Sequence, residues 1–206
     1  MTEIIFATNN QHKLLEIRSM LENSFRVHGL SELGLDEDIP EDHETLEENA
    51  FQKAEFVYDK LGRSCFADDT GLEIEALGGA PGVYSARYSR MGSPVYPEME
   101  VAAGNIRKVL EKMKGVQNRT ARFRTVIALI LGDNRYTFEG VVEGSIITEQ
   151  RGADGFGYDP IFLPHGSDKT FAEMDLADKN LVSHRAMAVQ KLVNFLQSDH
   201  HSIKKG

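Results

Sequence analysis

The chain has 206 residues and a formal net charge of −9 at pH 7, with 41% hydrophobic and 27% charged residues. This length suits one domain or two small lobes, and the acidic balance argues against broad binding to nucleic acid, whose affinity comes from neutralised phosphates. No apolar run of roughly 18 residues would span a bilayer, and the N-terminus carries an acid where a signal peptide carries bases, so we expect a cytoplasmic protein without nucleic-acid or membrane partners.

The first third of the chain shows alternating strand and helix patterns. Turn residues and a capping box separate the elements. The pattern predicts a strand at 3–7, a polar turn at 8–12, a helix at 13–21, a helix from the Thr45 cap to Gly62, and a strand at 64–67 that ends before two acids. The single cysteine, Cys65, lies in this apolar strand, and we expect a buried thiol.

The remaining chain is rich in β patterns and ends in a helix. We expect a strand at 72–77, a loop at 78–82, a helix at 100–114 that buries Val101, Ile106, Val109, Leu110 and Met113, a hairpin of strands 120–131 and 136–148, a glycine-rich segment at 152–158, an apolar run at 160–163 followed by a loop, and a helix capped by Ser183. Together these elements predict an α/β fold with a long mixed sheet. The tail at 199–206 is expected to fray.

Two adjacent carboxylates, Asp68 and Asp69, follow the expected end of a strand at Ala67. Neighbouring carboxylates repel each other when buried, so a cation is expected nearby, and a divalent metal ion is the strongest candidate. The competing interpretation is a solvated turn, because Asp, Thr and Gly all favour turns. These residues alone leave both interpretations open.

Two further segments carry groups that suit phosphate and metal. Residues 8–13 lead from a strand into a helix N-terminus, whose free N–H groups and Lys13 suit phosphate, although an Asn-capped helix explains the same pattern. An acidic group lies around the start of the next helix, and one of its carboxylates could reach a magnesium ion shared with Asp69. The group consists of Glu41, Asp42, Glu44, Glu47 and Glu48, with Asn49 and Lys53 on the helix.

Two later segments also carry candidate functional residues. Glycines around Phe156 and Tyr158 let the backbone pass close to a ligand with an aromatic ring available to stack on it, and a bulged hairpin is the alternative. Near the last helix, Lys179 and the pair His184–Arg185 place cations at a helix start. That placement opposes the dipole preference for acids and favours a functional reason.

Six segments, in order, resemble the motifs of the inosine/xanthosine triphosphate pyrophosphatase family. They are Thr8–Lys13, Glu48–Ala50, Ala67–Leu72, Gly78–Tyr88, Gly155–Phe162 and Ser183–Arg185. The resemblance extends from Ile4 to about Leu196. It implies Mg²⁺-dependent hydrolysis of ITP, dITP and XTP to a nucleoside monophosphate and pyrophosphate, which removes these nucleotides from the pool and keeps them out of DNA and RNA.

The resemblance also implies an architecture. Residues 1–198 would form one domain of two α/β lobes around the long mixed sheet, with the active site in the cleft between them. A homodimer is expected, with one Mg²⁺ per subunit; whether Mn²⁺ replaces it is left open.

Site residues follow from the matched motifs. By resemblance, Asp69 is the general base and a metal ligand, Glu41 is the second metal ligand, and Asp68 is a supporting charge. Substrate contacts are expected from Thr8, Asn9, Asn10, Gln11, His12, Lys13, Lys53, Thr70, Phe156, Gly157, Tyr158, Asp159, Lys179, His184 and Arg185. Thr70 stands where many relatives have Ser, and Asn9 replaces a frequent Gly, so the shape of the first loop differs in detail.

The implied chemistry has a physical basis. Asp69 would deprotonate a water for in-line attack at phosphorus, while Lys13 and the metal stabilise the developing charge. Hypoxanthine and xanthine carry an oxygen at C6 where adenine carries an amino group, so donors such as Lys179, His184 and Arg185 would leave buried groups unpaired with ATP. Rejection of GTP must depend on its 2-amino group. An aspartyl-phosphate phosphatase at Asp68 or Asp69 and a non-hydrolysing nucleotide sensor are the alternatives.

Overall fold

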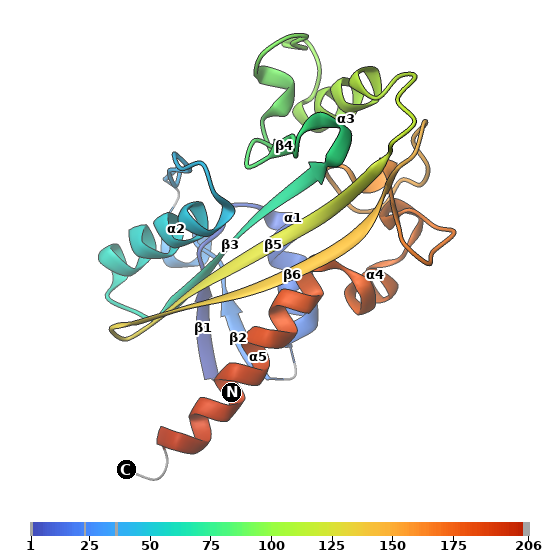
Figure 1. The fold of residues 1–206 in the computed structure, drawn as a ribbon. Helices are drawn as coiled ribbons and strands as arrows, with labels where there is room; N and C mark the ends of the chain where they lie inside the picture. Colours follow the sequence, from blue (N-terminus) through green and yellow to red (C-terminus); the bar gives the residue numbers. More distant parts are fainter. Residues whose placement is uncertain (1, 23, 36, 204–206) are drawn as a thin grey trace. The chain divides into compact units, whose positions relative to one another are not determined.

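The computed structural model describes residues 2–22, 24–35 and 37–203. The chain divides into two units. Unit 1 comprises the chain up to Asp69, residues 125–140 and the chain from Ser183, and unit 2 comprises residues 70–124 and 141–182. Three long strands continue from one unit into the other (Figure 1), and they are β3 (Cys65–Ile74), β5 (Thr120–Leu131) and β6 (Asn134–Ile146).

Unit 1 is built on the sheet order β2-β1-β3-β5-β6. Strand β1 (Thr2–Phe6) pairs in parallel with both β2 (Phe25–His28) and β3. The unit's helices are α1 (Gln11–Leu21), α2 (Leu46–Leu61) and α5 (His184–Ile203), with a 3₁₀ turn at Ser31–Leu33. Parallel pairing of β1 with β2 and β3 requires crossover connections, which α1 and α2 supply.

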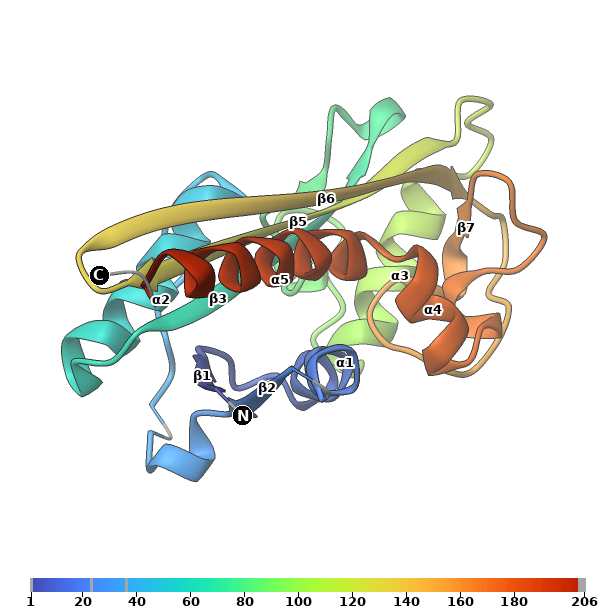
Figure 2. The same ribbon diagram turned by 90° about the horizontal axis from the view of Figure 1, so that it is seen from below.

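The two faces of the unit 1 sheet carry separate apolar clusters. Side chains alternate across a strand, so Phe6 and Phe66 point to one face and stack at 4.7 Å, while Ile5 and Cys65 point to the other. Helices α1 and α5 cover the first face, and Figure 2 shows α5 running along β5 and β6. Helix α2 covers the opposite face. The sheet is therefore buried on both sides.

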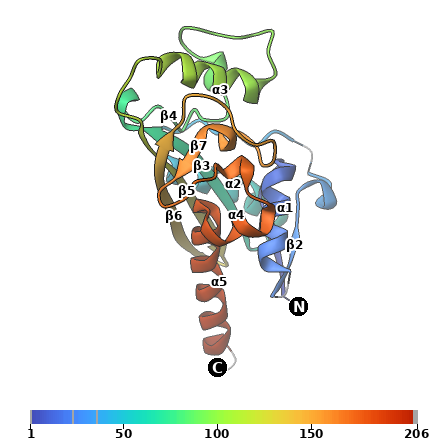
Figure 3. The ribbon, with the colours of Figure 1, turned by 90° about the vertical axis from the view of Figure 1, so that its right-hand side faces the viewer.

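Unit 2 contains the other ends of the three long strands. Strand β4 (Pro81–Gly82) pairs antiparallel with β3, and β7 (Phe162–Pro164) pairs antiparallel with β6. Helices α3 (Val101–Lys112) and α4 (Leu176–Val182) and four 3₁₀ turns complete the unit; these turns are Glu75–Leu77, Tyr88–Arg90, Asp159–Ile161 and Phe171–Glu173. In Figure 3, α3 lies at the same end of the unit as β4 and the loop between them.

Strand β3 differs from the prediction. The sequence predicts that a strand ends at Ala67 and that a turn follows, but β3 runs without interruption through Asp68, Asp69 and Gly71 to Ile74. A Cβ on Gly71 would lie 2.7 Å from the carbonyl oxygen of Gly82, so this glycine permits close backbone pairing rather than a turn. The predicted strand end at Ala67 was wrong, and of the two interpretations of the acids the solvated turn is contradicted, because both carboxylates are buried and their charges are compensated inside the fold.

The other elements largely agree with the sequence patterns. The mixed α/β fold with a long sheet is confirmed. The Thr45 cap and the Gly62 terminus of α2 are confirmed, as is the hairpin of β5 and β6. The exceptions are β2 and α4, which the sequence did not predict, residues 75–77, which form a 3₁₀ turn where the strand at 72–77 was expected to continue, and Val101, which is 36% exposed where a buried position was expected.

The C-terminal tail was predicted to fray. Helix α5 is described as far as Ile203, and residues 204–206 lie outside the described residues, so this point stays a prediction. In the described ranges no helix is both long and apolar enough to cross a membrane.

Candidate active site

Asp68 and Asp69 face opposite sides of β3. Because side chains alternate along a strand, Asp68 lies on the α1 and α5 face with Phe66, and Asp69 lies on the α2 face with Ala67. Each carboxylate has its own hydrogen-bonded cations: Lys13 and Arg185 bind Asp68, and Lys53 binds Asp69. The strand thus separates two adjacent acids that would repel each other on one face.

On the first face, four side chains form a row of ion pairs that begins and ends on α1, which we call the buried charge ring: Lys13, Asp68, Arg185 and Glu16. Lys13 Nζ lies 2.9 Å from Asp68 Oδ1, and Arg185 Nε lies 3.1 Å from Asp68 Oδ2. Arg185 Nη1 donates to Glu16 Oε2. Glu16 lies on α1, about one turn after Lys13. Two positive and two negative groups therefore join α1, β3 and α5.

The ring determines the charge state of its members. Burial alone would raise the pKa of Asp68, but the positive charges of Lys13 and Arg185 outweigh it and hold that pKa well below its usual range. Burial lowers the pKa of Lys13, and Asp68 only partly offsets this. Asp68 is therefore ionised at neutral pH, while Lys13 holds its proton less firmly than an exposed lysine.

On the second face, two carboxylates converge on Lys53. Its Nζ donates to Glu41 Oε1 and lies 3.3 Å from Asp69 Oδ1. Lys53 and Asp69 are buried, and Glu41 lies in the segment before α2. We refer to these three residues as the Lys53 cluster.

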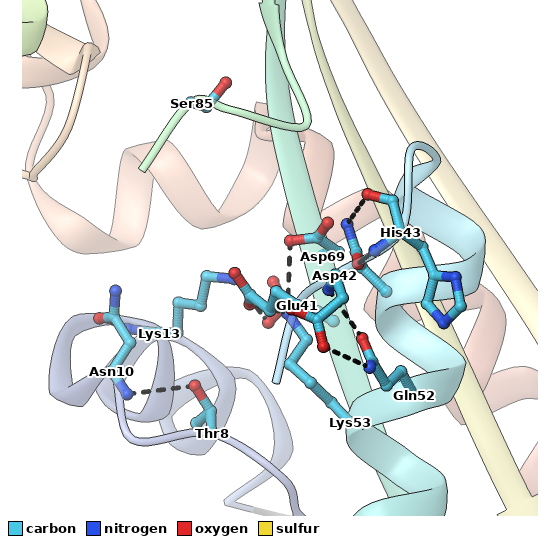
Figure 4. A network of polar contacts seen from close by, with 12 residues as sticks. Thr8, Asn10, Lys13, Glu41, Asp42, His43, Gln52, Lys53, Asp69 and Ser85 are labelled. Carbon is cyan, nitrogen blue, oxygen red and sulfur yellow. Dashed lines mark hydrogen bonds and ion pairs between the residues drawn. The ribbon is translucent and has the colours of Figure 1, made fainter. Parts of the chain in front are cut away.

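Helix α2 holds the Glu41 segment in place. The buried amide of Asn49 accepts from His43 N at 2.9 Å and donates to His43 O at 3.2 Å, and the Gln52 amide contacts Asp42 (Figure 4). Glu41 is therefore the acid of this segment that is directed toward Asp69. Sequence reasoning chose Glu41 among several acids, and the geometry favours that choice over Asp42.

The pKa values of Asp69 and Lys53 are both raised, for different reasons. Burial raises the pKa of Asp69, and the positive charge of Lys53 only partly offsets this. Burial by itself would lower the pKa of Lys53, but the nearby carboxylates, Asp69 first, raise it above its ordinary value. Asp69 is thus a more basic carboxylate than an exposed aspartate, while its neighbour Asp68 is less basic.

The donor set of the Lys53 cluster fits a hard divalent cation. Two carboxylates, Glu41 and Asp69, already converge on one positive group, and Mg²⁺ needs only one or two protein carboxylates when phosphates and water complete its shell. Within the described part of the chain, no group of three or more His, Cys, Asp or Glu side chains could hold a metal. The described residues therefore offer no cage for a tightly held structural metal ion. Glu41 and Asp69 are nevertheless suitable ligands for a metal ion that binds together with phosphates.

The predicted phosphate loop leads into α1. Asn10 caps the helix by accepting from Lys13 N at 3.1 Å, and Asn10 N donates to Thr8 Oγ1 at 3.2 Å. The first turn of α1 contains no acid, and Gln11 and His12 are exposed. Figure 4 shows Lys13 on the helix that Asn10 caps, and its Nζ donates to Asp68 Oδ1 at 2.9 Å. A helix N-terminus without acids and with a lysine beside it suits an anion.

The remaining predicted residues lie mainly in unit 2. Lys179 Nζ is 2.7 Å from Asp159 Oδ2 and 5.0 Å from the centroid of the Phe156 ring, and the Phe156 N–H donates to the same carboxylate oxygen at 2.8 Å. Lys179 and Asp159 are both buried. The Asp159–Lys179 pair therefore fixes the loop that carries Phe156.

Hydrogen bonds from Tyr158 and Asn105 also hold the backbone of unit 2 at Ser85. The Tyr158 hydroxyl donates to Ser85 O at 2.9 Å, and burial raises the Tyr158 pKa, so the hydroxyl stays protonated. Asn105 donates to the same carbonyl at 3.1 Å. Gly157 adopts a φ of 62°, which favours glycine, and Thr70 is half-buried at the start of the unit.

The structure brings some predicted residues together and adds others. In unit 1 it joins Lys13 to Asp68, and Lys53 to Glu41 and Asp69; His184 and Arg185 begin α5 and are buried. Asn9 donates to Glu37 O at 3.0 Å. The sequence analysis missed Glu16, although an acid on the apolar face of a helix, between Leu14 and Ile17, is itself a signal that a buried partner exists.

Comparison with known proteins gives concordant matches. The model of the Ham1 family matches residues 4–195. A curated relative from Porphyromonas gingivalis, named dITP/XTP pyrophosphatase, is 54% identical over 197 residues, which cover 95% of this chain and 98% of the relative. A relative of the same name from Bacillus subtilis is 46% identical over 202 residues, covering 96% and 98%.

Solved structures agree with these matches. The Ham1 protein of Staphylococcus aureus aligns with a TM-score of 0.82 at 38% identity, over 96% of this chain and 100% of that one. A HAM1 protein from Coxiella burnetii aligns with a TM-score of 0.83 at 38% identity and the same coverage. The resemblance based on six sequence motifs is therefore confirmed.

Proposed function

Since the chain belongs to the Ham1 family, we propose that it hydrolyses purine nucleoside triphosphates that carry hypoxanthine or xanthine, releasing pyrophosphate. The observation that carries the proposal is the 54% identity, over nearly the whole of both chains, to a relative named dITP/XTP pyrophosphatase. The matched region, residues 4–195, includes both Asp residues of β3, the Lys53 cluster and the Asp159–Lys179 pair. ITP, dITP and XTP are the proposed substrates.

The triphosphate is assigned to unit 1. The N-terminus of α1, with Thr8, Asn10 and Lys13, offers N–H groups, a hydroxyl and a positive charge. Glu41 and Asp69 would hold Mg²⁺, which would neutralise phosphate charge. Lys53 would then be released from the two carboxylates and become available to a phosphate oxygen.

Asp69 is the proposed general base. Burial raises its pKa, which makes it a better proton acceptor than an exposed aspartate. Asp69 takes a proton from a water molecule, the water oxygen forms a bond to phosphorus, and the bond between the α- and β-phosphates breaks. The products are a nucleoside monophosphate and pyrophosphate, without a covalent enzyme intermediate.

The base is assigned to the Phe156 loop of unit 2. Phe156 would stack on the purine, and Lys179 would donate toward an acceptor on its edge while Asp159 holds it in position. Contacts of His184 and Arg185 with the base stay predictions from the resemblance, since Arg185 donates to Asp68 and Glu16 in the structure. A pocket of donors leaves groups unpaired with adenine and rejects ATP by a factor on the order of 10⁴.

The proposal extends to the biological setting. Removing such triphosphates from the nucleotide pool would keep hypoxanthine and xanthine out of DNA and RNA. We further propose a cytoplasmic homodimer, following the expectation from the sequence.

Substitution of the general base tests the proposal. Asp69→Asn keeps the size of the side chain but cannot accept a proton at neutral pH, so pyrophosphate release from ITP with Mg²⁺ should fall by a factor of about 10² or more, typical of a lost acid–base group. Calorimetric ITP affinity should change far less. Glu98→Gln, an exposed substitution, serves as control. If Asp69→Asn hydrolyses ITP at the control rate, Asp69 is not the base; if the unmodified protein binds ITP without hydrolysing it, the protein is a sensor.

A further inference from the structure

The segment Gly78–Tyr88 matches one of the six family motifs, but the proposed function gives it no task. After β4 the segment continues as turns: Ser85 N donates to Gly82 O at 3.1 Å, and Arg87 N donates to Tyr84 O at 3.0 Å. In such irregular backbone the buried N–H and C=O groups need partners outside helices and strands. Several of those partners meet at Ser85, which is 9% exposed.

Four hydrogen bonds that involve side chains meet at Ser85. Its hydroxyl accepts from Leu72 N on β3 at 2.9 Å and donates to Gly82 O at 2.6 Å. Its carbonyl oxygen accepts from the Tyr158 hydroxyl at 2.9 Å and from Asn105 Nδ2 on α3 at 3.1 Å. A carbonyl oxygen has two lone pairs, so both acceptor positions are in use. We call Ser85, Asn105 and Tyr158 the Ser85 hub.

Helix α3 holds the Ser85 carbonyl without help from Tyr158. The Asn105 side chain is buried, and it also binds the backbone on the far side of Ser85. Its Nδ2 donates to Ala86 O at 3.2 Å, and its Oδ1 accepts from Ser89 N at 2.6 Å. The Ser85 carbonyl is therefore an acceptor with a fixed position, and Tyr158 binds to it.

The Tyr158 side chain connects this acceptor to the loop that carries Phe156. The Tyr158 ring is buried in the apolar cluster of unit 2, whereas Phe156, two residues earlier, is half-buried. The Phe156 N–H is held separately by Asp159, at 2.8 Å. The loop is therefore anchored twice, by the Asp159–Lys179 pair and by the Ser85 hub.

We propose that Tyr158 is a positioning residue, whose hydrogen bond to Ser85 O holds the loop in the conformation in which Phe156 stacks on the purine. This inference rests on the proposed function of Phe156. It gives Gly78–Tyr88 a task as the support of that loop. Because its hydroxyl is bound inside unit 2, the Tyr158 side chain acts on the substrate through Phe156.

Tyr158→Phe removes the hydroxyl alone. Ser85 O keeps Asn105 as a donor, so the substitution leaves no carbonyl at the hub without a partner, and the variant should fold. A typical net hydrogen bond shifts a conformational equilibrium about fivefold, and a ligand that binds only the positioned conformation loses affinity as that conformation becomes rarer. We therefore expect KM for ITP to rise about threefold to fivefold. Turnover should change little, because saturating substrate selects the positioned conformation.

The first measurement is kcat and KM for pyrophosphate release from ITP in the unmodified protein, Tyr158→Phe and Tyr136→Phe. Tyr136→Phe is the matched control, because it makes the same chemical change on a half-buried ring of unit 1, which packs on Phe195 with the centroids 4.4 Å apart.

Amide hydrogen exchange in the nucleotide-free proteins, followed by NMR, is the second readout. Asp159 N donates to Phe156 O at 3.2 Å and Ile161 N donates to Tyr158 O at 3.0 Å, so exchange of these two amides reports opening of the loop. The amides of α3 report general loosening of unit 2.

A raised KM with a nearly unchanged kcat, and faster exchange at Asp159 and Ile161 but not in α3, is the expected result. A KM, or exchange at these two amides, equal to that of Tyr136→Phe would overturn the proposal. Faster exchange in α3 as well would also overturn it, because general loosening would then explain the raised KM. If the unmodified protein releases no pyrophosphate, the proposed function fails, and the exchange rates still decide whether Tyr158 holds the loop.

Discussion

Asp68 is predicted to be a main source of stability in unit 1, and Asp68→Asn tests this. The side chain is 1% exposed and binds two cations at 2.9 and 3.1 Å. Asparagine keeps the shape but removes the charge, so Lys13 and Arg185 lose their shared counter-ion. Removing one partner of a buried ion pair costs about 3–5 kcal/mol. The loss should lie near the lower end, because Lys13, whose pKa burial already lowers, can shed its proton.

Urea unfolding at pH 7, followed by circular dichroism, measures this change. We expect a lower midpoint with an unchanged slope, which indicates altered stability rather than an altered unfolded state. Glu32→Gln, which breaks the exposed pair with Arg18, should lose no more than about 1 kcal/mol.

The loss of stability in Asp68→Asn should also depend on pH. The folded-state pKa of Asp68 lies below its ordinary value of 3.8, so its contribution is complete above pH 3.8 and decreases as the pH falls below it. The difference in the free energy of unfolding between the two proteins should therefore narrow as the pH falls below 3.8. A loss below about 1 kcal/mol at pH 7, well short of the cost of a broken buried pair, would refute this view of the ring.

Three further predictions follow from burial and charge. In metal-free protein with ¹³C-labelled aspartate, the carboxyl of Asp69 should titrate above 3.8 and that of Asp68 below it; titration in the reverse order would contradict the assigned faces of β3. Lys179→Met should lower the free energy of unfolding by about 3–5 kcal/mol, since it leaves Asp159 buried without its ammonium partner. Urea unfolding measures this change, and a clearly smaller loss would contradict the prediction. Burial raises the pKa of the Cys65 thiol to about 12, so a disulfide reagent at pH 8 should modify it only after unfolding.

The sequence predicted local structure best where a local signal exists. Thr45 and Gly62 mark the ends of α2 because a cap and a left-handed terminus are properties of a few neighbouring residues. The hairpin of β5 and β6 was predicted for the same reason. Strand β2 and helix α4 are short, four and seven residues, and their patterns are too brief to distinguish from loops.

The sequence pointed to charged residues that the structure pairs, but it did not predict how they are arranged. Asp68 and Asp69 were recognised as a pair, but a strand-ending turn was expected, because turn preference is local and the cations that stabilise both acids come from distant segments. Arg185 lies 117 positions from Asp68 along the chain, so no spacing rule connects them. Glu16 was missed for the same reason: its partner is an arginine 169 positions away.

The products formed from different nucleotides test the central claim most directly. The purified protein would be incubated with ITP, XTP, dITP, GTP and ATP in the presence of Mg²⁺, with pyrophosphate and orthophosphate measured separately. We predict pyrophosphate from the first three and little from GTP or ATP. Orthophosphate as the released product would contradict the account and favour a phosphatase, and equal hydrolysis of all five nucleotides would contradict the proposed selection of the base.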